Sequence, residues 1–404
     1  MTFFRTIGGG GKPCCDGPTL LKKRVLTMSE ITLLAEVTAF LRQPHGQFIA
    51  GEREAGRGAP FAVINPATGR AIAEVTAADS DQADRAVESA RQAFNQWREM
   101  PTLARGTLLL KLADALAEHR EALAQLESLC SGKTITLARM LELDQSVAFL
   151  RYFAGWAGKV TGETLNVSLP SMAGEKYTAF TRRQPLGVVV GIVPWNFSIM
   201  IAVWKLAAAL VCGCTIVLKP SEYTPLTLLR VAELAKAVGI PDGVINVVNG
   251  AGGEIAQRLI THPACAKVSF TGSVATGEKV QQSASASGKR VTLELGGKNA
   301  ALFLDDLTPE AMVNGILEAG YLNQGQICAA AERFYLPQGK LDAVLALLKD
   351  KLSAFAPGSP LDERTLMGPL ANRQQYDKVL RLIQTARDEG DTIVCGGEAL
   401  PGEG

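Results

Sequence analysis

The sequence has almost no excess of one charge: 41 Lys and Arg stand against 40 Asp and Glu in 404 residues, a formal net charge of +1. Proteins dedicated to nucleic acids need a basic surface to meet the phosphates, so this balance argues against a nucleic-acid partner. Histidine is scarce as well, since the chain has only His45, His119 and His262, far apart in sequence. We therefore expect no histidine-rich metal site and predict no bound metal.

Long apolar runs and a secretory signal are also missing. The longest apolar segment, Ile199 to Cys214, contains Lys205 and is short for a bilayer-spanning helix. Residues 1–19 lack the sustained apolar run of a secretory signal. The eight cysteines are too few in a chain of this length for a disulfide scaffold and fit reduced thiols. These features predict a cytoplasmic protein without a membrane partner.

The first 27 residues differ from the rest of the chain. They contain Gly8 to Gly11, the pair Cys14-Cys15 and the run Lys22 to Arg24, but neither the period of a strand nor that of a helix. We expect residues 1–27 to be disordered, either as a leader that precedes a true start at Met28 or as a flexible tail. The remaining length suits two globular domains.

Helical spacing comes first along the remaining chain, and strand–helix alternation follows it. Three helical blocks are predicted, over residues 79–97, 103–130 and 137–160. From residue 187 onward, five apolar strands alternate with four helices. The strands are predicted at 187–193, 215–219, 244–248, 267–271 and 290–295, and the helices between them at 199–211, 225–238, 253–260 and 274–284. This alternation predicts an α/β fold with a parallel, doubly wound sheet.

A second α/β unit is expected after Gly296-Gly297. Its first strand is predicted at 299–304 and its first helix at 309–322. The chain then ends at Gly404, directly after turn residues, so we expect this second unit to be incomplete.

Three side chains have the chemistry of a catalytic centre. Cys328 follows a glycine-containing turn and could serve as a thiolate nucleophile, although a lone cysteine is more often a buried structural residue. Glu294 ends an expected buried strand, where burial would raise its pKa and suit a general base; it could instead pair with Lys298. Asn196 follows the first strand and could donate to an oxyanion, or simply cap the next helix.

Two further segments have features of a dinucleotide site. Glu222, with Lys219 and Ser221, follows the second strand, and its carboxylate could accept hydrogen bonds from a ribose diol; a surface turn is the simpler alternative. Gly272 and Ser273 stand where the fourth strand passes into a helix, whose N-terminus favours a pyrophosphate. A lone Gly-x-x-x-x-Gly is weak evidence, and the ordinary Gly-x-Gly-x-x-Gly fingerprint is absent from the expected place.

Together, in this order and at predicted strand ends, these motifs resemble those of the aldehyde dehydrogenase superfamily, and the resemblance extends from about Gln47 to Gly397. It implies a dinucleotide-binding domain over residues 28–296, with an oligomerisation hairpin at about 163–186, and a catalytic domain over residues 297–404. It also implies a homodimer or homotetramer and a small-molecule aldehyde as substrate.

The resemblance assigns roles to single residues. Cys328 matches the nucleophile and Glu294 the general base, while Asn196 and the Cys328 amide match the oxyanion hole. Lys205 matches a lysine behind the general base. The expected cofactor is NAD, with NADP possible but less preferred because Glu222 repels a 2′-phosphate. The residues matched to the cofactor site are Val193, Pro194, Trp195, Lys219, Ser221, Glu222, Gly272, Ser273 and Leu295.

An apolar substrate is expected, aromatic or arylalkyl like phenylacetaldehyde. Apolar side chains flank the matched catalytic positions, and no Arg stands among them to recognise a carboxylate. Ser198 occupies a position where many relatives have proline, which makes this segment similar to that of phenylacetaldehyde dehydrogenases. The same side chains could be ordinary core residues. The expected pocket residues are Phe197, Ile201, Trp204, Leu322 and Ile327.

Two alternatives to a complete aldehyde dehydrogenase stay open. A CoA-acylating enzyme would release the acyl group to a thiol, but Glu294, as a water-activating base, argues against it. Members of the family normally continue past Gly404 with a Glu-x-Phe-Gly-Pro segment and a terminal pairing strand, which this sequence lacks. A chain truncated inside its catalytic domain is expected to bind the dinucleotide with little or no turnover.

Overall fold

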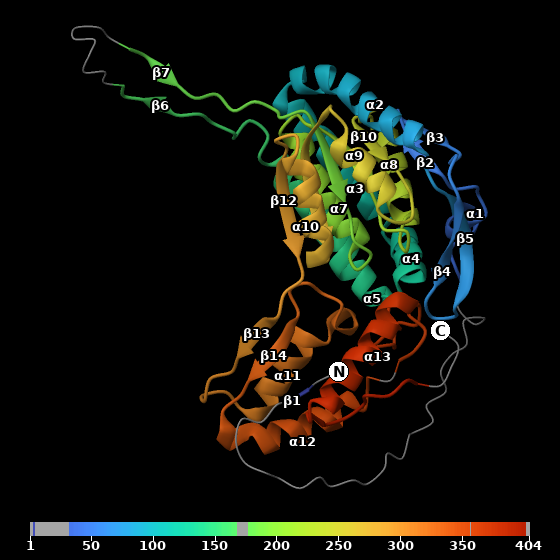
Figure 1. The fold of residues 1–404 in the computed structure, drawn as a ribbon, viewed down its shortest axis with the longest axis vertical. Coiled ribbons are helices and arrows are strands. Elements are labelled where there is room, and N and C mark those ends of the chain that lie inside the picture. Colours follow the sequence, from blue (N-terminus) through green and yellow to red (C-terminus); the bar gives the residue numbers. More distant parts are fainter. Residues whose placement is uncertain (1–2, 5–31, 168–176, 356, 401–404) are drawn as a thin grey trace.

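The computed structural model describes residues 3–4, 32–167, 177–355 and 357–400. A large body, at the top of Figure 1, contains a seven-stranded sheet with helices on both faces. A small body lies below it and is formed mainly by the chain that follows strand β12.

The order of the elements changes from mainly helical to alternating near residue 188. The strands are β1 Phe3–Phe4, β2 Gln47–Ile49, β3 Glu52–Glu54, β4 Pro60–Asn65, β5 Arg70–Thr76, β6 Thr164–Leu165, β7 Ala179–Phe180, β8 Val188–Ile192, β9 Thr215–Lys219, β10 Ile245–Val247, β11 Cys265–Gly272, β12 Arg290–Leu295, β13 Asn299–Leu302, β14 Ala331–Tyr335 and β15 Thr392–Ile393. The α-helices are α1 Ala35–Leu41, α2 Ser80–Glu99, α3 Thr102–Glu118, α4 Arg120–Ser131, α5 Ile135–Leu137, α6 Gln145–Ala154, α7 Ser198–Val211, α8 Leu226–Ala237, α9 Glu254–Thr261, α10 Val274–Ser285, α11 Pro309–Gly320, α12 Leu341–Leu352 and α13 Arg373–Asp388. Shorter helical segments are η2 Ala138–Asp144, which is a π-helix, and the 3-10 segments η3 Leu322–Gly325 and η4 Gln338–Lys340.

The strand order of the main sheet is β12-β11-β8-β9-β10-β2-β3. β8 to β12 are parallel, whereas β2 pairs antiparallel with β10 and β3 pairs antiparallel with β2. The first parallel strand, β8, is central, and later strands add on either side of it. The strand order therefore reverses between β8 and β11, and doubly wound sheets bind ligands beside the carboxyl ends at such a point. The parallel, doubly wound α/β fold predicted from the sequence is confirmed.

Each face of the sheet has its own apolar core. All five residues of β8 are buried, and successive side chains point to opposite faces. Val189 packs in a core with residues of α3, α4, α6, α7 and α8, whereas Val188 and Val190 pack with residues of α2 and α9. Burial on both faces explains why this strand is a continuous apolar run in the sequence.

Smaller pairs of strands stand outside the main sheet. β4 and β5 form an antiparallel hairpin, and β6 and β7 form a second one that projects from the large body in Figure 1. This second hairpin falls within the predicted segment 163–186, of which residues 168–176 lie outside the described residues. In the small body β13 and β14 are parallel. Its separate apolar core contains Met312, Val313, Ile316, Tyr321, Val344 and Leu348.

Two helical blocks differ from their predicted bounds. The block expected at 103–130 divides at His119 into α3 and α4. The block expected at 137–160 begins with α5, passes through the π-helix η2 and ends at Ala154, six residues early. Hydrophobic spacing continues across both irregularities, so periodicity alone does not reveal them.

Parts of the N-terminal region also differ from expectation. β2 and β3 were not predicted, because three residues are too few to establish a strand period. Within the leader 1–27, expected to be disordered, Phe3–Phe4 forms a strand that pairs antiparallel with β15, and the other residues lie outside the described ones. None of the described helices is long and apolar enough to span a membrane. In the same described ranges, no three His, Cys, Asp or Glu side chains are grouped to hold a metal ion.

Candidate active site

The candidate site begins at the carboxyl end of β8, where the strand order reverses. The chain leaves the sheet through Val193 and enters α7 at Ser198. The Val193 N–H donates to the Lys219 carbonyl at 3.0 Å, so the ends of β8 and β9 lie side by side. Val193 is buried, and Pro194 and Trp195 are half-buried. These three residues, which are among those matched to the cofactor site, therefore lie at the end of the sheet where doubly wound folds bind ligands.

Cys328 follows a turn with a strained backbone. Asn323 and Gln324 have φ values of +49° and +57°, and Gly325 continues the turn at +73°. Residues other than glycine adopt this left-handed region rarely and need surrounding contacts to hold them there. One such contact is the Asn323 side chain, whose Nδ2 donates to the Asn196 carbonyl at 3.4 Å. Cys328 itself is exposed, which excludes the alternative of a buried structural cysteine.

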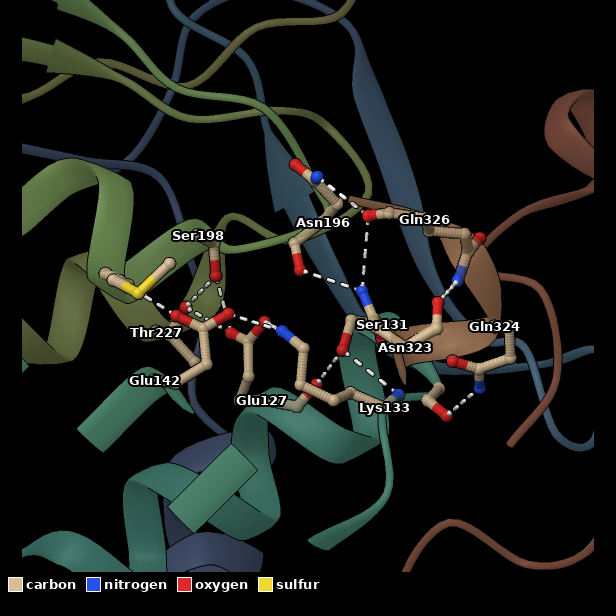
Figure 2. A network of polar contacts seen from close by, with 12 residues as sticks. Glu127, Ser131, Lys133, Glu142, Asn196, Ser198, Thr227, Asn323, Gln324 and Gln326 are labelled. Carbon is tan, nitrogen blue, oxygen red and sulfur yellow. Dashed lines mark hydrogen bonds and ion pairs between the residues drawn. The ribbon is translucent and has the colours of Figure 1, made fainter. Parts of the chain in front are cut away.

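The Asn196 side chain connects the end of β8 to this turn (Figure 2). Its Nδ2 donates to the Gln326 carbonyl at 2.8 Å, and Gln326 Nε2 donates to the Asn323 carbonyl at 3.1 Å. A primary amide has two N–H groups, so the bond to Gln326 leaves one for an oxyanion near Cys328. The alternative of a helix cap is not what the structure shows, because the N-cap position of α7 is Phe197 and has no side-chain cap.

Glu294 does not have the environment expected from the sequence. β12 is the edge strand of the main sheet rather than a buried one, and Glu294 is exposed. The apolar residues of this strand predicted a buried position for Glu294. However, β12 has a neighbouring strand on one side only, so even Leu293 and Leu295 are just half-buried. Pairing with Lys298 is not observed either, since Lys298 forms its ion pair with Glu332.

Lys205 reaches from α7 to β11, the strand beside Glu294. Its Nζ donates to Thr271 Oγ1 at 2.8 Å and to Ser269 Oγ at 3.1 Å. Thr271 is the register partner of Glu294 across the two strands. Burial lowers the pKa of Lys205 to about 8, although attraction to the Glu294 carboxylate opposes that change. Lys205 therefore contacts the strand next to the one that carries Glu294, and its role stays a prediction.

A buried cation ends β9. Lys219 is 4% exposed, and its Nζ donates to the Pro220 carbonyl at 3.2 Å. Burial lowers the pKa of Lys219, while attraction to Glu222 works in the opposite direction. Glu222 and Ser221 are half-buried, and Ser221 Oγ accepts the Tyr223 N–H at 3.3 Å. A simple surface turn does not explain a buried ammonium, whereas a hydroxyl-rich ligand would supply acceptors for it.

The end of β11 meets the N-terminus of α10. A Cβ on Gly272 would lie 2.6 Å from the Phe270 ring, so a larger residue would have to displace this buried ring. Ser273 caps α10, because its Oγ accepts the Thr276 N–H at 3.3 Å. Leu295, the register partner of Gly272, is half-buried. A glycine and an exposed helix N-terminus at this place are compatible with a pyrophosphate.

Two of the expected pocket residues are core residues instead. Phe197 and Ile201 are each 3% exposed and belong to the main apolar core. Because both side chains are buried among core residues, the predicted apolar tunnel does not include them. The core alternative is correct for both.

The other three pocket residues are accessible. Trp204 is 38% exposed, and its ring lies 5.2 Å from that of Phe149 on α6. Leu322, 37% exposed, and Ile327, half-buried, stand on either side of the cysteine turn. Phe149 was not found from the sequence, because its position on another helix carries no local signal.

Amide side chains that hold the cysteine turn were also missed. Gln324 Nε2 donates to the Pro369 carbonyl at 3.1 Å and to the Gly132 carbonyl at 3.4 Å. The run Asn-Gln-Gly-Gln before Ile327 contained a signal, because Asn and Gly tolerate left-handed backbone and favour turns.

The chain is similar to known proteins in sequence and in fold. The model of the aldehyde dehydrogenase family matches residues 53–404. The chain belongs to the aldehyde dehydrogenase family. It is therefore an NAD(P)-dependent enzyme that oxidises aldehydes to carboxylic acids.

Individual relatives are aldehyde dehydrogenases as well. The chain is 42% identical over 364 residues to phenylacetaldehyde dehydrogenase of Pseudomonas fluorescens, covering 89% of this chain and 72% of that one. It is 40% identical to human retinaldehyde dehydrogenase 3, covering 88% and 70% of the two chains. The structure of the NAD+ complex of an aldehyde dehydrogenase from Bacillus cereus matches with a TM-score of 0.89 at 40% identity, over 93% of this chain and 76% of that one. The resemblance inferred from the motifs is confirmed.

Lys205→Met should change how stability depends on pH. The pKa of Lys205 is about 8 in the folded chain against an ordinary value of 10.5, so the unfolded chain binds more protons between these pH values. The free energy of unfolding should therefore rise with pH across this window, by up to about 3 kcal/mol. Urea unfolding at pH 8 and pH 10.5 measures this increase in the free energy of unfolding. Lys205→Met should lack the increase that comes from Lys205, whereas Lys111→Met, at an exposed position, should retain it. Equal rises in both variants would contradict the burial of Lys205.

Proposed function

We propose that the protein oxidises an aromatic or arylalkyl aldehyde, such as phenylacetaldehyde, to the carboxylic acid with NAD. The observation that carries the proposal is the bond from the Asn196 amide to the Gln326 carbonyl. It joins the ligand-binding end of a doubly wound sheet to the turn of an exposed cysteine. A nucleophile, an oxyanion donor and a place for a dinucleotide then share one region.

The reaction starts at Cys328. Its thiolate attacks the aldehyde carbon, the π electrons of the C=O bond move to oxygen, and a thiohemiacetal oxyanion forms. The Asn196 Nδ2 and the Cys328 main-chain N–H donate to this oxyanion and stabilise it. The left-handed turn at Asn323 and Gln324 sets the direction of the main chain at Cys328, so it decides whether the two donors converge.

The second half of the reaction releases the acid. NAD, when bound, supplies the acceptor for the hydride that leaves the thiohemiacetal carbon. Loss of that hydride restores the C=O bond and leaves a thioester on Cys328. Glu294 then accepts a proton from a water molecule, the resulting hydroxide attacks the thioester, and the acid departs as the Cys328 thiolate is regenerated. The exposure of Glu294 gives water access to its carboxylate.

The residues at the end of β9 fit the adenosine side of NAD. The Lys219 ammonium has three N–H donors and gives one to the Pro220 carbonyl, so the others can meet ribose hydroxyls. The nearby Glu222 carboxylate can accept from a 2′-hydroxyl but repels a 2′-phosphate.

NAD should therefore be preferred over NADP. We expect a higher kcat/KM with NAD than with NADP. Glu222→Gln should lower the ratio of the two kcat/KM values, because the substitution removes the charge that repels the 2′-phosphate. Glu118→Gln, on the exposed end of α3, is the control and should leave the ratio unchanged. A clear preference of the unaltered protein for NADP would refute this assignment.

Accessible aromatic and aliphatic side chains support an aromatic substrate. Trp204 and Phe149 form an aromatic pair on neighbouring helices, and Leu322 and Ile327 flank the turn of Cys328. Such side chains suit an apolar ring and offer no charge to a substrate carboxylate. The likeness to phenylacetaldehyde dehydrogenase supports the same class of substrate.

The β6–β7 hairpin supports an oligomer. Leu165 and Phe180 on this hairpin are 45% and 71% exposed, an apolar surface that a second copy of the chain could cover. We propose a homodimer or homotetramer, and sedimentation of the protein as a monomer would contradict it.

Phenylacetaldehyde should give a higher kcat/KM than succinate semialdehyde or betaine aldehyde. Trp204→Ala should lower kcat/KM for phenylacetaldehyde about tenfold or more and affect acetaldehyde less, because the lost contact is with the ring. Tyr335→Ala, on an exposed strand of the small body, is a control that should leave the ranking unchanged. A higher kcat/KM for succinate semialdehyde or betaine aldehyde than for phenylacetaldehyde would overturn the proposed substrate class.

The two halves of the reaction should separate in variants. Cys328→Ala should abolish oxidation, whereas Glu294→Gln should keep a first burst of NADH and lose steady turnover. Asn196→Ala should lower the rate about 10²–10³-fold, the usual effect of losing one oxyanion donor. Stopped-flow measurement of NADH distinguishes burst from steady rate, with exposed Glu310→Gln as the matched control. An unchanged steady rate in Glu294→Gln would show that another group activates the water.

A further inference from the structure

A second polar cluster lies beside the oxyanion donor (Figure 2). Glu127 of α4, Lys133 of the following loop and Glu142 of η2 are each 0% exposed. The Lys133 ammonium forms ion pairs with both carboxylates, at 3.4 Å from Glu127 Oε1 and in closer contact with Glu142 Oε1. Apolar side chains of the same volume often pack as stably as a buried ion pair, so stability alone does not account for this cluster.

The two carboxylates hold the first turn of α7. Glu142 Oε2 accepts the Met200 N–H at 2.8 Å, and this N–H is one of those that a helix leaves without a partner at its N-terminus. Glu127 Oε2 accepts the Ser198 hydroxyl at 2.5 Å. The N-cap residue Phe197 offers no side-chain cap, so the buried carboxylates take over that task.

Lys133 acts on the residue next to the oxyanion donor. Its ammonium lies 4.3 Å from the centre of the Phe197 ring, a distance at which a cation is attracted to the face of an aromatic ring. Phe197 directly follows Asn196 in the chain. The fixed position of the Phe197 ring therefore limits the directions in which the Asn196 amide can point.

The same loop contacts the cysteine turn. The Gly132 carbonyl accepts a hydrogen bond from Gln324 Nε2 at 3.4 Å (Figure 2). Two residues after Lys133, the Ile135 N–H donates to the Pro360 carbonyl at 2.7 Å, which ties the start of α5 to the segment that follows α12. The loop thus touches both the start of α7 and the strained turn that precedes the nucleophile.

We propose that Lys133, held by two buried carboxylates, is a positioning residue that keeps the Asn196 donor aligned with the turn of Cys328. The inference rests on the proposed function, because it assigns Lys133 a part in stabilising the oxyanion of that reaction. Lys133 acts through the Phe197 ring and through its neighbour Gly132, with no contact to the reacting atoms. A small misplacement of a reacting group can lower a rate on the order of 10²-fold, so the chemical step is the sensitive one.

The test is a double-mutant cycle of Lys133→Met, which keeps the length but removes the charge, with Asn196→Ala. Lys133→Met should lower the single-turnover rate of NADH formation about tenfold or more, with the KM for aldehyde changed less than about twofold. In the Asn196→Ala background the same substitution should have less than about a twofold effect, because the donor it positions is gone. If the fold decreases in single-turnover rate of the two single variants multiply in the double variant, the proposal is overturned.

Companion variants separate positioning from stability. Leu112→Ala in the core of α3 should lower the free energy of unfolding but leave the single-turnover rate unchanged. Lys133→Arg should recover part of the rate, since it restores the charge. If Lys133→Met does not fold, Ser198→Ala replaces it in the cycle: it removes one hydrogen bond to Glu127 and should show a smaller loss with the same non-additivity. Additive behaviour of Ser198→Ala would again overturn the proposal.

Amide hydrogen exchange tests the positioning role of Lys133 without depending on aldehyde oxidation. In the Lys133→Met protein, or in Ser198→Ala if that variant replaces it, the amides of the first turn of α7 and those from Gln324 to Cys328 should exchange faster. In Leu112→Ala they should exchange as in the unaltered protein. Unchanged exchange in the Lys133 variant would overturn the positioning role. A protein that oxidises no aldehyde would contradict the proposed function alone, and the exchange rates would still decide the role of Lys133.

Discussion

The hydrogen bond from the Asn196 side chain to the Gln326 carbonyl is the contact on which the arrangement of the site depends. On one side of it stands the central strand of a buried sheet, and on the other the left-handed turn of Asn323 and Gln324. Strained residues persist only where their surroundings hold them, and here side-chain hydrogen bonds from the turn to the carbonyls of Asn196, Gly132 and Pro369 supply those surroundings. The hydrogen bond therefore joins Asn196, at the end of the sheet, directly to the turn of Cys328.

Three buried lysines differ in the polar groups that the protein offers them. Lys133, Lys205 and Lys219 are 0%, 8% and 4% exposed, and a buried ammonium is costly unless polar groups surround it. Lys133 has two carboxylates, Lys205 has two hydroxyls, and Lys219 has a backbone carbonyl as its hydrogen-bond acceptor among the described residues. The ammonium with the least compensation from the protein lies where a ribose is proposed to bind.

The parallel sheet could be predicted because strands buried on both faces are continuous apolar runs. Asn196 and Cys328 were chosen as candidates from their places after a strand and a turn, and the structure brings Asn196 to that turn. The prediction that Glu294 is buried was wrong, because an edge strand can have the same apolar residues as a central strand. Lys133 was not found, because its partners come from separate elements that only the fold brings together. The boundary at residues 296 and 297 and the roles of the single site residues stay predictions.

The position of the covalent intermediate shows which side chain attacks the aldehyde. Glu294→Gln protein is mixed briefly with NAD and phenylacetaldehyde, quenched in acid and digested, and mass spectrometry then locates any acyl group. We predict a phenylacetyl thioester on Cys328, formed at the same rate as the burst of NADH and absent when NAD is left out. An acyl group on a different cysteine, or NADH formation while the Cys328 peptide stays unmodified, would contradict it.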